Sequence, residues 1–213
     1  MNIFFIHTVN GLTDAFSSLA REHVPAAKCT HVSDQSLIQA IIAATGPTAA
    51  VFRRVCDHVA HAEASGASVV QLTCSTISPC ADVAAKLVSI PVLKIDDAMM
   101  EHAAANFRTI GLAATNPGTL GPSTDLLREK IAGAGRGGRF ETVLCDGAFD
   151  AFLSGDMKRH DEIVTAALQG LMKKVDVVVL AQASMARIAD ALPDKRVPVL
   201  ASPPFAMKRL ALL

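Results

Sequence analysis

The sequence contains no tryptophan and no tyrosine, so only its nine phenylalanines could stack on nucleic-acid bases. Its 20 basic and 20 acidic side chains cancel, and lysine and arginine nowhere form a dense run. Nucleic acids and anionic membranes attract proteins through clustered positive charge, which is missing here. We therefore expect neither nucleic acid nor membrane as a partner, and a small molecule instead.

Long apolar runs are also absent, because no stretch approaches the ~18 residues that a membrane-spanning helix needs. The chain starts with an apolar strand, Met1 to Ile6, without the basic region and cleavage site of a signal peptide. Its five cysteines are an odd number and include no CxxC pair, which disfavours a disulfide scaffold and a zinc site. We predict a cytoplasmic protein with reduced thiols and no metal.

Residues 1–95 are repeated loosely in residues 107–203. Three pairs of segments match: 90–93 with 197–200, 19–22 with 126–129, and 69–72 with 177–180. The offset is 107 for the first two pairs (197 − 90 and 126 − 19) and 108 for the third (177 − 69). An offset kept over most of the chain indicates a duplicated structural unit.

Strands alternate with helices in each half. The apolar runs at Ile3 to Ile6 and Thr109 to Ala113 are each followed by a polar loop and an amphipathic stretch, Thr13 to His23 and Ser123 to Ala132. Further amphipathic stretches, Ala49 to Ala64 and Asp161 to Lys174, lead into the runs Val69 to Leu72 and Val177 to Leu180. These two runs are apolar without alternation, as expected of strands covered on both faces. Because parallel neighbours need a crossover, the order implies parallel sheets.

We predict an α/β fold with two pseudo-symmetric, duplicated parallel-sheet domains and the active-site cleft between them. The first domain is expected to combine residues 1–95 with 204–213, and the second to span residues 96–203, with a terminal helix from Phe205 to Leu213 on the first half. The glycine-rich run at residues 133–138 follows a helix and lacks a GKS or GKT ending, so it is expected to form a turn rather than a phosphate loop.

Polar loops follow four of the predicted strands, at the sheet edge where open parallel sheets bind ligands. They contain Thr8, Asn10, Thr73, Ser75, Thr76, Thr115, Asn116, Thr119, Ala183 and Ser184, besides Cys74 and Gln182. None of these loops contains lysine or arginine. Neutral donors and helix N-termini can hold a carboxylate, so we expect a small carboxylate as the ligand. The alternative is that part of these hydroxyls only cap helices.

Cys74 differs from the other four cysteines in its position. It directly follows a strand and precedes Ser78-Pro79, which predicts a helix N-cap with proline at the first helical position. The free N–H groups of a helix N-terminus favour a thiolate, so we predict that Cys74 is the most reactive thiol. Packing in the core explains the other cysteines, Cys29, Cys56, Cys80 and Cys145. On the repeat frame, Cys74 corresponds to Gln182 (182 − 74 = 108).

The segment Thr73-Cys74-Ser75-Thr76, with Ile90 to Ala98 after it, resembles the aspartate/glutamate racemase superfamily. Val178 to Met185, with Val197 to Leu200, is most similar to the hydantoin racemase branch. The resemblance covers essentially the whole chain. It implies two pseudo-symmetric α/β domains around a cleft and catalysis without a cofactor. It also implies two cysteines on opposite faces of a substrate carbon, which remove and return its proton.

The resemblance implies roles for individual residues. Cys74 matches the cysteine of the first domain, and Ser75 and Thr76 match its substrate-binding neighbours. Asn10 and residues 115–119 lie where the other carboxylate-binding loops are expected. Gln182 stands in place of the second cysteine, and its amide can neither accept nor deliver a proton at neutral pH. The implied enzyme is an isomerase that acts through Cys74 at the α carbon of a small carboxylate or amino-acid-like substrate.

Two alternatives stay open. One is a decarboxylase with protonation from one side, as in the arylmalonate decarboxylases of the superfamily, for which one cysteine is enough. The other is a degenerate protein that only binds a small anion. Racemisation would need another group on the second face, and His7 and Asp97 lie at strand ends. A homo-oligomer such as a dimer also stays open.

Overall fold

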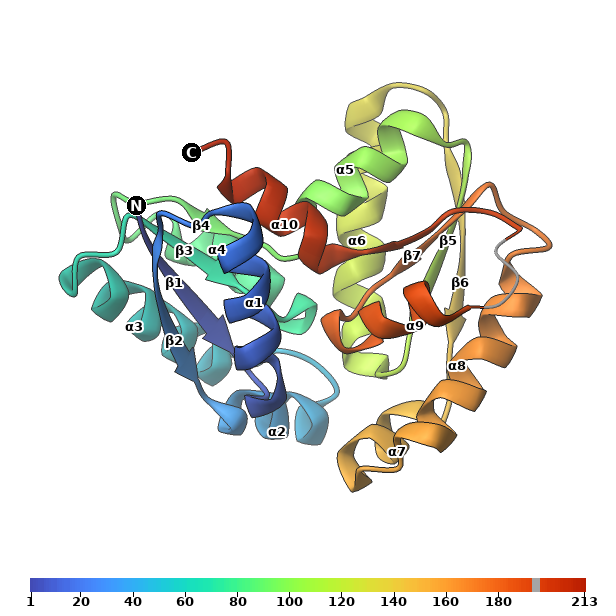
Figure 1. Ribbon diagram of the computed structural model, residues 1–213, viewed down its shortest axis with the longest axis horizontal. Coiled ribbons are helices and arrows are strands. Elements are labelled where there is room, and N and C mark those ends of the chain that lie inside the picture. The colour runs from blue at the N-terminus through green and yellow to red at the C-terminus, as the bar shows by residue number, and fades with distance from the viewer. Residues whose placement is uncertain (193–195) are drawn as a thin grey trace. The chain divides into compact units, whose positions relative to one another are not determined.

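The computed structural model describes residues 1–192 and 196–213 of the chain. The chain forms two compact units, Met1–Asp97 with Pro203–Leu213 and Ala98–Ser202. Within the described residues, each unit contains a four-stranded sheet in which all neighbouring strands are parallel, with helices packed around it (Figure 1).

The sheet of the first unit has the strand order β2-β1-β3-β4. Its strands are β1 (Asn2–His7), β2 (Lys28–Ser33), β3 (Val69–Leu72) and β4 (Val92–Leu93). In the central pair, Ile6 of β1 is in register with Leu72 of β3. The loops after these two strands therefore begin next to each other at the same edge.

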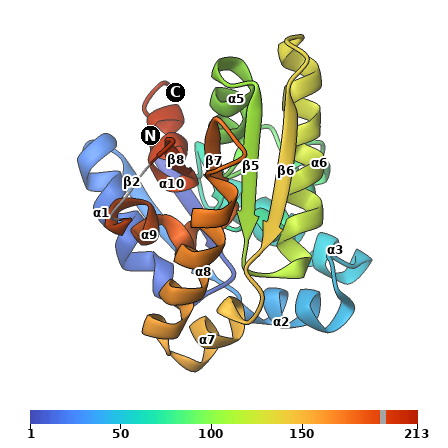
Figure 2. The ribbon, with the colours of Figure 1, turned by 90° about the vertical axis from the view of Figure 1, so that its right-hand side faces the viewer.

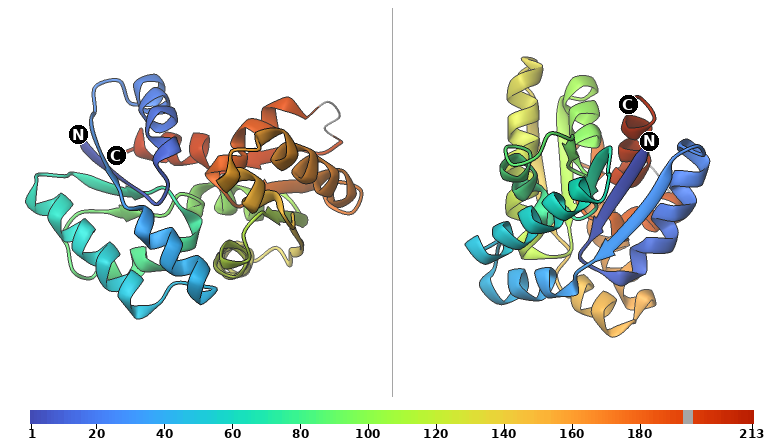
Figure 3. Two further views of the ribbon diagram at one scale, coloured as in Figure 1. Left: turned by 90° about the horizontal axis from the view of Figure 1, so that it is seen from below. Right: turned by 90° about the vertical axis from the view of Figure 1, so that its left-hand side faces the viewer.

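Helices cover both faces of this sheet. They are α1 (Thr13–His23), α2 (Gln35–Ala44), α3 (Ala49–Ala64), α4 (Ser78–Ala84) and α10 (Ser202–Leu210), with 3-10 turns η1 (Asn10–Leu12) and η2 (Ser75–Ile77). Apolar residues of α2, α3 and α4 form one buried cluster with β1 and β3. Phe16 of α1 packs on Phe5 of β1, with ring centroids 5.7 Å apart. Figure 3 shows α1 and α3 on opposite sides of the sheet.

The second unit repeats this order as β6-β5-β7-β8. Its elements are α5 (Asp97–Asn106), β5 (Thr109–Ala114), α6 (Pro117–Ala134), β6 (Arg139–Leu144), α7 (Ala148–Ser154), α8 (Met157–Leu171), β7 (Val177–Leu180), η3 (Ala183–Met185), α9 (Ala186–Ala191) and β8 (Val199–Ala201). Helices α7, α8 and α9 share a buried cluster with β5 and β7. Figure 2 shows α8 and α6 on opposite sides of β5 and β6.

The predicted α/β fold with duplicated parallel sheets is confirmed, although several boundaries differ. Helix α6 begins at Pro117, six residues before the predicted start, because the Asn116 side chain caps it by accepting from the Gly118 amide at 2.9 Å. The terminal helix begins at Ser202 and ends at Leu210. Of the glycine-rich run at residues 133–138, residues 133–134 still belong to α6, and the predicted turn begins at Gly135. Gly135 and Gly137 have φ angles of 64° and 68°, which favour glycine.

The strands β2 and β6 were not among those predicted. Both lie at the edge of their sheets, and their residues are only partly buried, so they lack the continuous apolar run of the central strands. Among the helices of the described residues, none is long and apolar enough to cross a membrane.

Candidate functional site

Cys74 lies at the carboxyl end of the central strand β3. The preceding residue, Thr73, anchors the loop, because its amide and its hydroxyl both donate to the carbonyl oxygen of Ile6 at 3.0 Å. Cys74 itself has an extended backbone (φ −128°, ψ 121°) and precedes the 3-10 turn η2. Its side chain is partly exposed, whereas Thr73, Ser75 and Thr76 are at most 2% exposed. The loop therefore presents a partly exposed thiol next to three buried polar residues.

The helix after Cys74 starts differently from the prediction. Proline 79 lies in the first turn of α4, as expected, but the predicted N-cap role of Ser78 is wrong. The Ser78 hydroxyl instead donates to Oδ1 of Asp96 at 2.8 Å, in the interior. A buried carboxyl group needs hydrogen-bond donors, and the Ser78 hydroxyl supplies one of them.

Asp96 is a buried acid behind the Cys74 loop that the sequence did not reveal. It is 1% exposed and hydrogen-bonded by Ser78 and Ser75. Burial raises the pKa of Asp96 to about 6, and the hydrogen bonds from the two serines limit the rise. Asp96 therefore takes up a proton at a higher pH than an ordinary aspartate, and the two serines that donate to it belong to the segment that follows Cys74.

The other four thiols are less available for ionisation. Burial raises the pKa of Cys80 to about 12 and that of Cys145 to about 11. It also raises the pKa of Cys29 and of Cys56, where the charge of Asp57 adds to the effect. A thiolate is the nucleophilic and basic form of cysteine, so these four environments work against reactivity.

The other predicted substrate-binding residues of the first unit follow the strand next to that of Cys74. Thr8 and Asn10 follow β1, the strand next to β3. Thr8 is buried, whereas Asn10 is exposed and its Oδ1 accepts from the Ser33 hydroxyl at 2.5 Å. The structure therefore brings Thr8, Asn10 and the Cys74 loop to one edge of the first sheet.

His7 and Asp97, considered as groups for the second face of a substrate, are both engaged within the first unit. His7 is fully buried, with Nδ1 2.9 Å from Thr73 Oγ1 and Nε2 2.9 Å from His31 Nδ1. Burial, assisted by the neighbouring His31, lowers the pKa of His7 to about 4, so its ring is neutral at neutral pH. Asp97 Oδ2 accepts from Arg209 Nη1 at 2.8 Å. These contacts disfavour both as mobile proton donors.

The predicted residues of the second unit also meet at one sheet edge. Gln182 follows β7 and Thr115 follows β5, its neighbour in the sheet. The Gln182 oxygen Oε1 accepts from the amide of Thr115 at 2.6 Å and from its hydroxyl at 2.9 Å. Ala183 and Ser184 open the turn η3 directly after it and are partly exposed. Because Oε1 is fixed, the Gln182 side chain can offer its amide nitrogen as a donor.

The start of α6 presents further neutral donors. Asn116 is 4% exposed, and its Nδ2 has no hydrogen-bond partner among the described residues. Thr119 is 1% exposed, and its amide donates to the carbonyl oxygen of Asn116 at 3.0 Å. A buried donor without a partner at the N-terminus of an 18-residue helix suits an anion. No group of three or more His, Cys, Asp or Glu side chains that could hold a metal occurs in residues 1–192 and 196–213.

The chain is similar in fold to solved racemase structures. Allantoin racemase from Klebsiella pneumoniae matches with a TM-score of 0.75 and 20% identity, over 100% of this chain and 87% of that one. Glutamate racemase from Francisella tularensis, in complex with D-glutamate, matches with a TM-score of 0.79 and 17% identity, over 98% and 78% of the two chains. A variant of arylmalonate decarboxylase matches with a TM-score of 0.60 and 18% identity, over 99% and 93%. At these identities the likeness shows the fold.

No functionally curated protein matches the sequence. The family model described as Asp/Glu/Hydantoin racemase, by contrast, matches residues 6–210, which is nearly the whole chain. That range includes every strand except the first four residues of β1, and both of the polar loops that contain Cys74 and Gln182. The chain therefore belongs to the Asp/Glu/hydantoin racemase family.

Proposed function

We propose that this protein is a cofactor-independent enzyme in which the Cys74 thiolate exchanges a proton with the α carbon of a small carboxylate or amino-acid-like substrate. The observation that supports it most is the contrast among the thiols. Cys74 is partly exposed at the end of a central strand, while burial raises the pKa of each of the other four. A positioned acid or base of this kind contributes ~10²–10⁴-fold to a proton transfer.

The substrate class follows from the donors at the strand ends. The loops contain hydroxyl and amide side chains without lysine or arginine. The unpartnered Nδ2 of Asn116 at the start of α6 adds a buried donor that an incoming carboxylate could satisfy. Neutral donors stabilise a carboxylate and, in the transition state, an enolate oxygen, without the strong fixed charge that phosphate recognition usually employs.

Gln182 favours a second candidate function, decarboxylation followed by protonation from one side. Its Oε1 is held by Thr115, and its amide nitrogen can donate to a carboxylate or an enolate but cannot transfer a proton. With Cys74 as the proton donor, loss of CO₂ from a malonate-like substrate gives an enolate that Cys74 protonates. The balance needs no cofactor, because the electrons of the broken C–C bond form the new C–H bond.

Proton exchange in D₂O separates these functions. We would incubate the protein with amino acids, hydantoins, allantoin and substituted malonates, and follow the α-proton signal and the release of CO₂. Exchange at an α carbon supports the isomerase-type function, and CO₂ release from malonates supports the decarboxylase. Binding without either reaction would show a small-anion-binding protein and contradict the proposal.

A further inference from the structure

Four polar side chains form a continuous row of hydrogen bonds inside the first unit. His7 Nδ1 lies 2.9 Å from Thr73 Oγ1, His7 Nε2 lies 2.9 Å from His31 Nδ1, and His31 Nε2 lies 3.0 Å from Ser17 Oγ. The row starts at the residue before Cys74 and ends between α1 and β2. None of these side chains takes part in the chemistry proposed above.

The direction of every hydrogen bond in the row follows from its inner end. The carbonyl oxygen of Ile6 can only accept, so the Thr73 hydroxyl, 3.0 Å away, donates its single hydrogen to it. Thr73 Oγ1 must then accept from His7, which requires the Nδ1–H form of the ring. Neutral His7 consequently accepts at Nε2, and the donor there is Nδ1–H of His31.

Packing holds the two rings in the geometry that this bond needs. The planes of His7 and His31 differ by only 13°, with centroids 5.2 Å apart, which fits an in-plane N–H···N hydrogen bond. Phe5 stacks on His31 with ring centroids 5.0 Å apart, and Phe16 and His7 pack in a T-shaped arrangement with centroids 5.5 Å apart. His7, Phe5 and Phe16 are buried and His31 is partly buried, so contacts among β1, β2 and α1 restrain both histidine rings.

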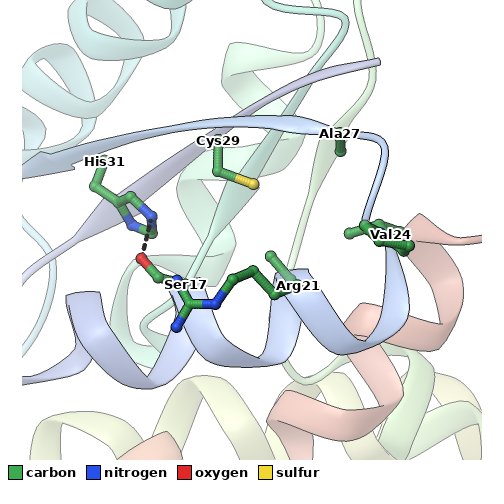
Figure 4. A pocket seen from close by; sticks show the side chains of 8 residues that line it. Ser17, Arg21, Val24, Ala27, Cys29 and His31 are labelled. Carbon is green, nitrogen blue, oxygen red and sulfur yellow. Dashed lines mark hydrogen bonds between the residues drawn. The ribbon is translucent and has the colours of Figure 1, made fainter.

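The outer end of the row reaches a pocket of about 240 Å³ between α1 and β2. Figure 4 shows Ser17 and Arg21 of α1 on one side of it and Cys29 and His31 of β2 on the other. Neutral His31 accepts at Nε2 from the Ser17 hydroxyl. His31 is thus the member of the histidine pair that meets this pocket, whereas His7 is fully buried.

We propose that His31 and His7 are positioning residues for the Cys74 loop, because together they fix the hydroxyl of Thr73 on the carbonyl oxygen of Ile6. If His31 cannot donate, His7 can adopt the Nε2–H form, and its Nδ1 becomes an acceptor. The Thr73 hydroxyl then turns from Ile6 to His7, and the loop keeps only the Thr73 amide as its bond to Ile6. The importance of this row for catalysis rests on the proposed function of Cys74, but the row can be tested without it.

The first measurement needs no variant. Nitrogen-15 NMR of the imidazole rings in the intact protein at neutral pH should show both His7 and His31 as neutral Nδ1–H forms. An Nε2–H form of either ring would overturn the proposal, since the row would then have a different direction. This measurement detects the tautomer of each ring directly. If the rings only filled space, their tautomers would not be constrained.

Two substitutions at one position supply the second test. His31→Phe keeps a flat ring against Phe5 without a donor, whereas His31→Asn places an amide N–H where Nδ1 stood. We expect His31→Phe to convert His7 to Nε2–H and to speed amide hydrogen exchange at residues 73–77 by roughly two- to thirty-fold, the range for side chains that act through a chain of neighbours. His31→Asn should keep Nδ1–H on His7 and near-normal exchange. Equal behaviour of the two variants would contradict the proposal.

A control and a functional readout complete the design. His61→Phe, on the exposed side of α3, should change neither the His7 tautomer nor amide exchange at residues 73–77. If the tautomers respond as expected and the unmodified protein exchanges no α proton, the positioning row stands and the proposed function fails. If α-proton exchange occurs and both His31 variants behave alike, the proposed function stands and the positioning row fails.

Discussion

The loops after β3 and β7 have nearly the same backbone and different surroundings. Cys74 has φ −128° and ψ 121°, Gln182 has φ −127° and ψ 135°, and each precedes a 3-10 turn that leads into a short helix. Around Cys74, however, Thr73, Ser75 and Thr76 are buried and polar, while Gln182 lies between Ala181 and Ala183. The duplication has kept the backbone of the two loops, and the buried polar support belongs to the first.

The acid behind the Cys74 loop is likewise confined to the first copy. Asp96 corresponds on the repeat frame to Pro203 (203 − 96 = 107), which has no side-chain acceptor. In the second copy the corresponding support is a single residue, Thr115, whose amide and hydroxyl both bind Gln182 Oε1. One loop is therefore built around an ionisable group and the other around a fixed neutral amide.

The largest effect should follow from removing the thiol. Cys74→Ala should lower α-proton exchange or decarboxylation by ~10²–10⁴-fold, the usual contribution of a positioned acid or base. Cys29→Ala removes the other partly exposed thiol and should leave the rate within a factor of two. Proton NMR in D₂O measures both. Equal activity of Cys74→Ala and the unmodified protein would remove the chemical distinction between the two loops.

The second loop can be converted instead of the first. Gln182→Cys restores the residue that the family resemblance implies at this position, so racemisation should appear or rise, on the order of 10²-fold for a newly supplied acid. Gln182→Ala is the matched control, since it removes the amide without adding a proton donor. Chiral chromatography with D- and L-substrates gives the result. Efficient racemisation by the unmodified protein would show that another group already acts on the second face.

Asp96 makes a prediction about stability. Its pKa is raised from an ordinary value of 3.8 to about 6 in the folded protein, so the folded state binds the proton more tightly than the unfolded state. The contribution of Asp96 to the free energy of unfolding is therefore fully present below about pH 4. It is lost as the pH rises through about 6. The difference corresponds to about 3 kcal/mol, at 1.36 kcal/mol for each pKa unit.

Asp96→Asn tests this directly, because the amide oxygen can still accept from Ser78 and the side chain no longer ionises. Urea unfolding should show Asp96→Asn as the more stable protein at pH 7, by up to ~3 kcal/mol. At pH 4 the two proteins should be similar. Asp82→Asn, at an exposed acid that binds Lys94, should lack this pH pattern. A stabilisation that is equal at both pH values would show that ionisation of Asp96 is not its cause.

The sequence predicts the fold better than it predicts the buried contacts that hold the Cys74 loop. Val177 to Leu180 is a fully buried, continuous apolar run, and Val69 to Leu72 is equally buried with Gln71 as its one polar residue. Such runs without alternation identify central strands that are covered on both faces. By contrast, Lys28 to His31 alternates partly buried with exposed residues at a sheet edge, which resembles a polar loop. The polar residues that follow the central strands were found because the carboxyl ends of parallel strands meet at one edge.

The buried contacts were not accessible, because they depend on pairing between distant segments. Asp96 and Asp97 are adjacent and chemically identical, yet only Asp96 is fully buried, while Asp97 pairs with Arg209 at the other end of the chain. His7 and His31 are 24 residues apart and meet through the parallel pairing of β1 with β2, an edge strand that the sequence did not indicate. A local pattern contains no information about either pairing.

The smallest predicted effect concerns the two partly exposed thiols, Cys74 and Cys29. Burial raises the pKa of Cys29, which lowers its thiolate fraction at a given pH. We therefore expect iodoacetamide at pH 8 to label Cys74 faster than Cys29, with the three buried thiols slower still. Mass spectrometry after brief exposure assigns the sites, and labelling in urea, where all five should react at similar rates, is the control. Faster labelling of Cys29 in the folded protein would mean that solvent exposure affects the labelling rate more than ionisation of the thiol does. The contrast between the Cys74 loop and its Gln182 counterpart would then rest on catalytic data alone.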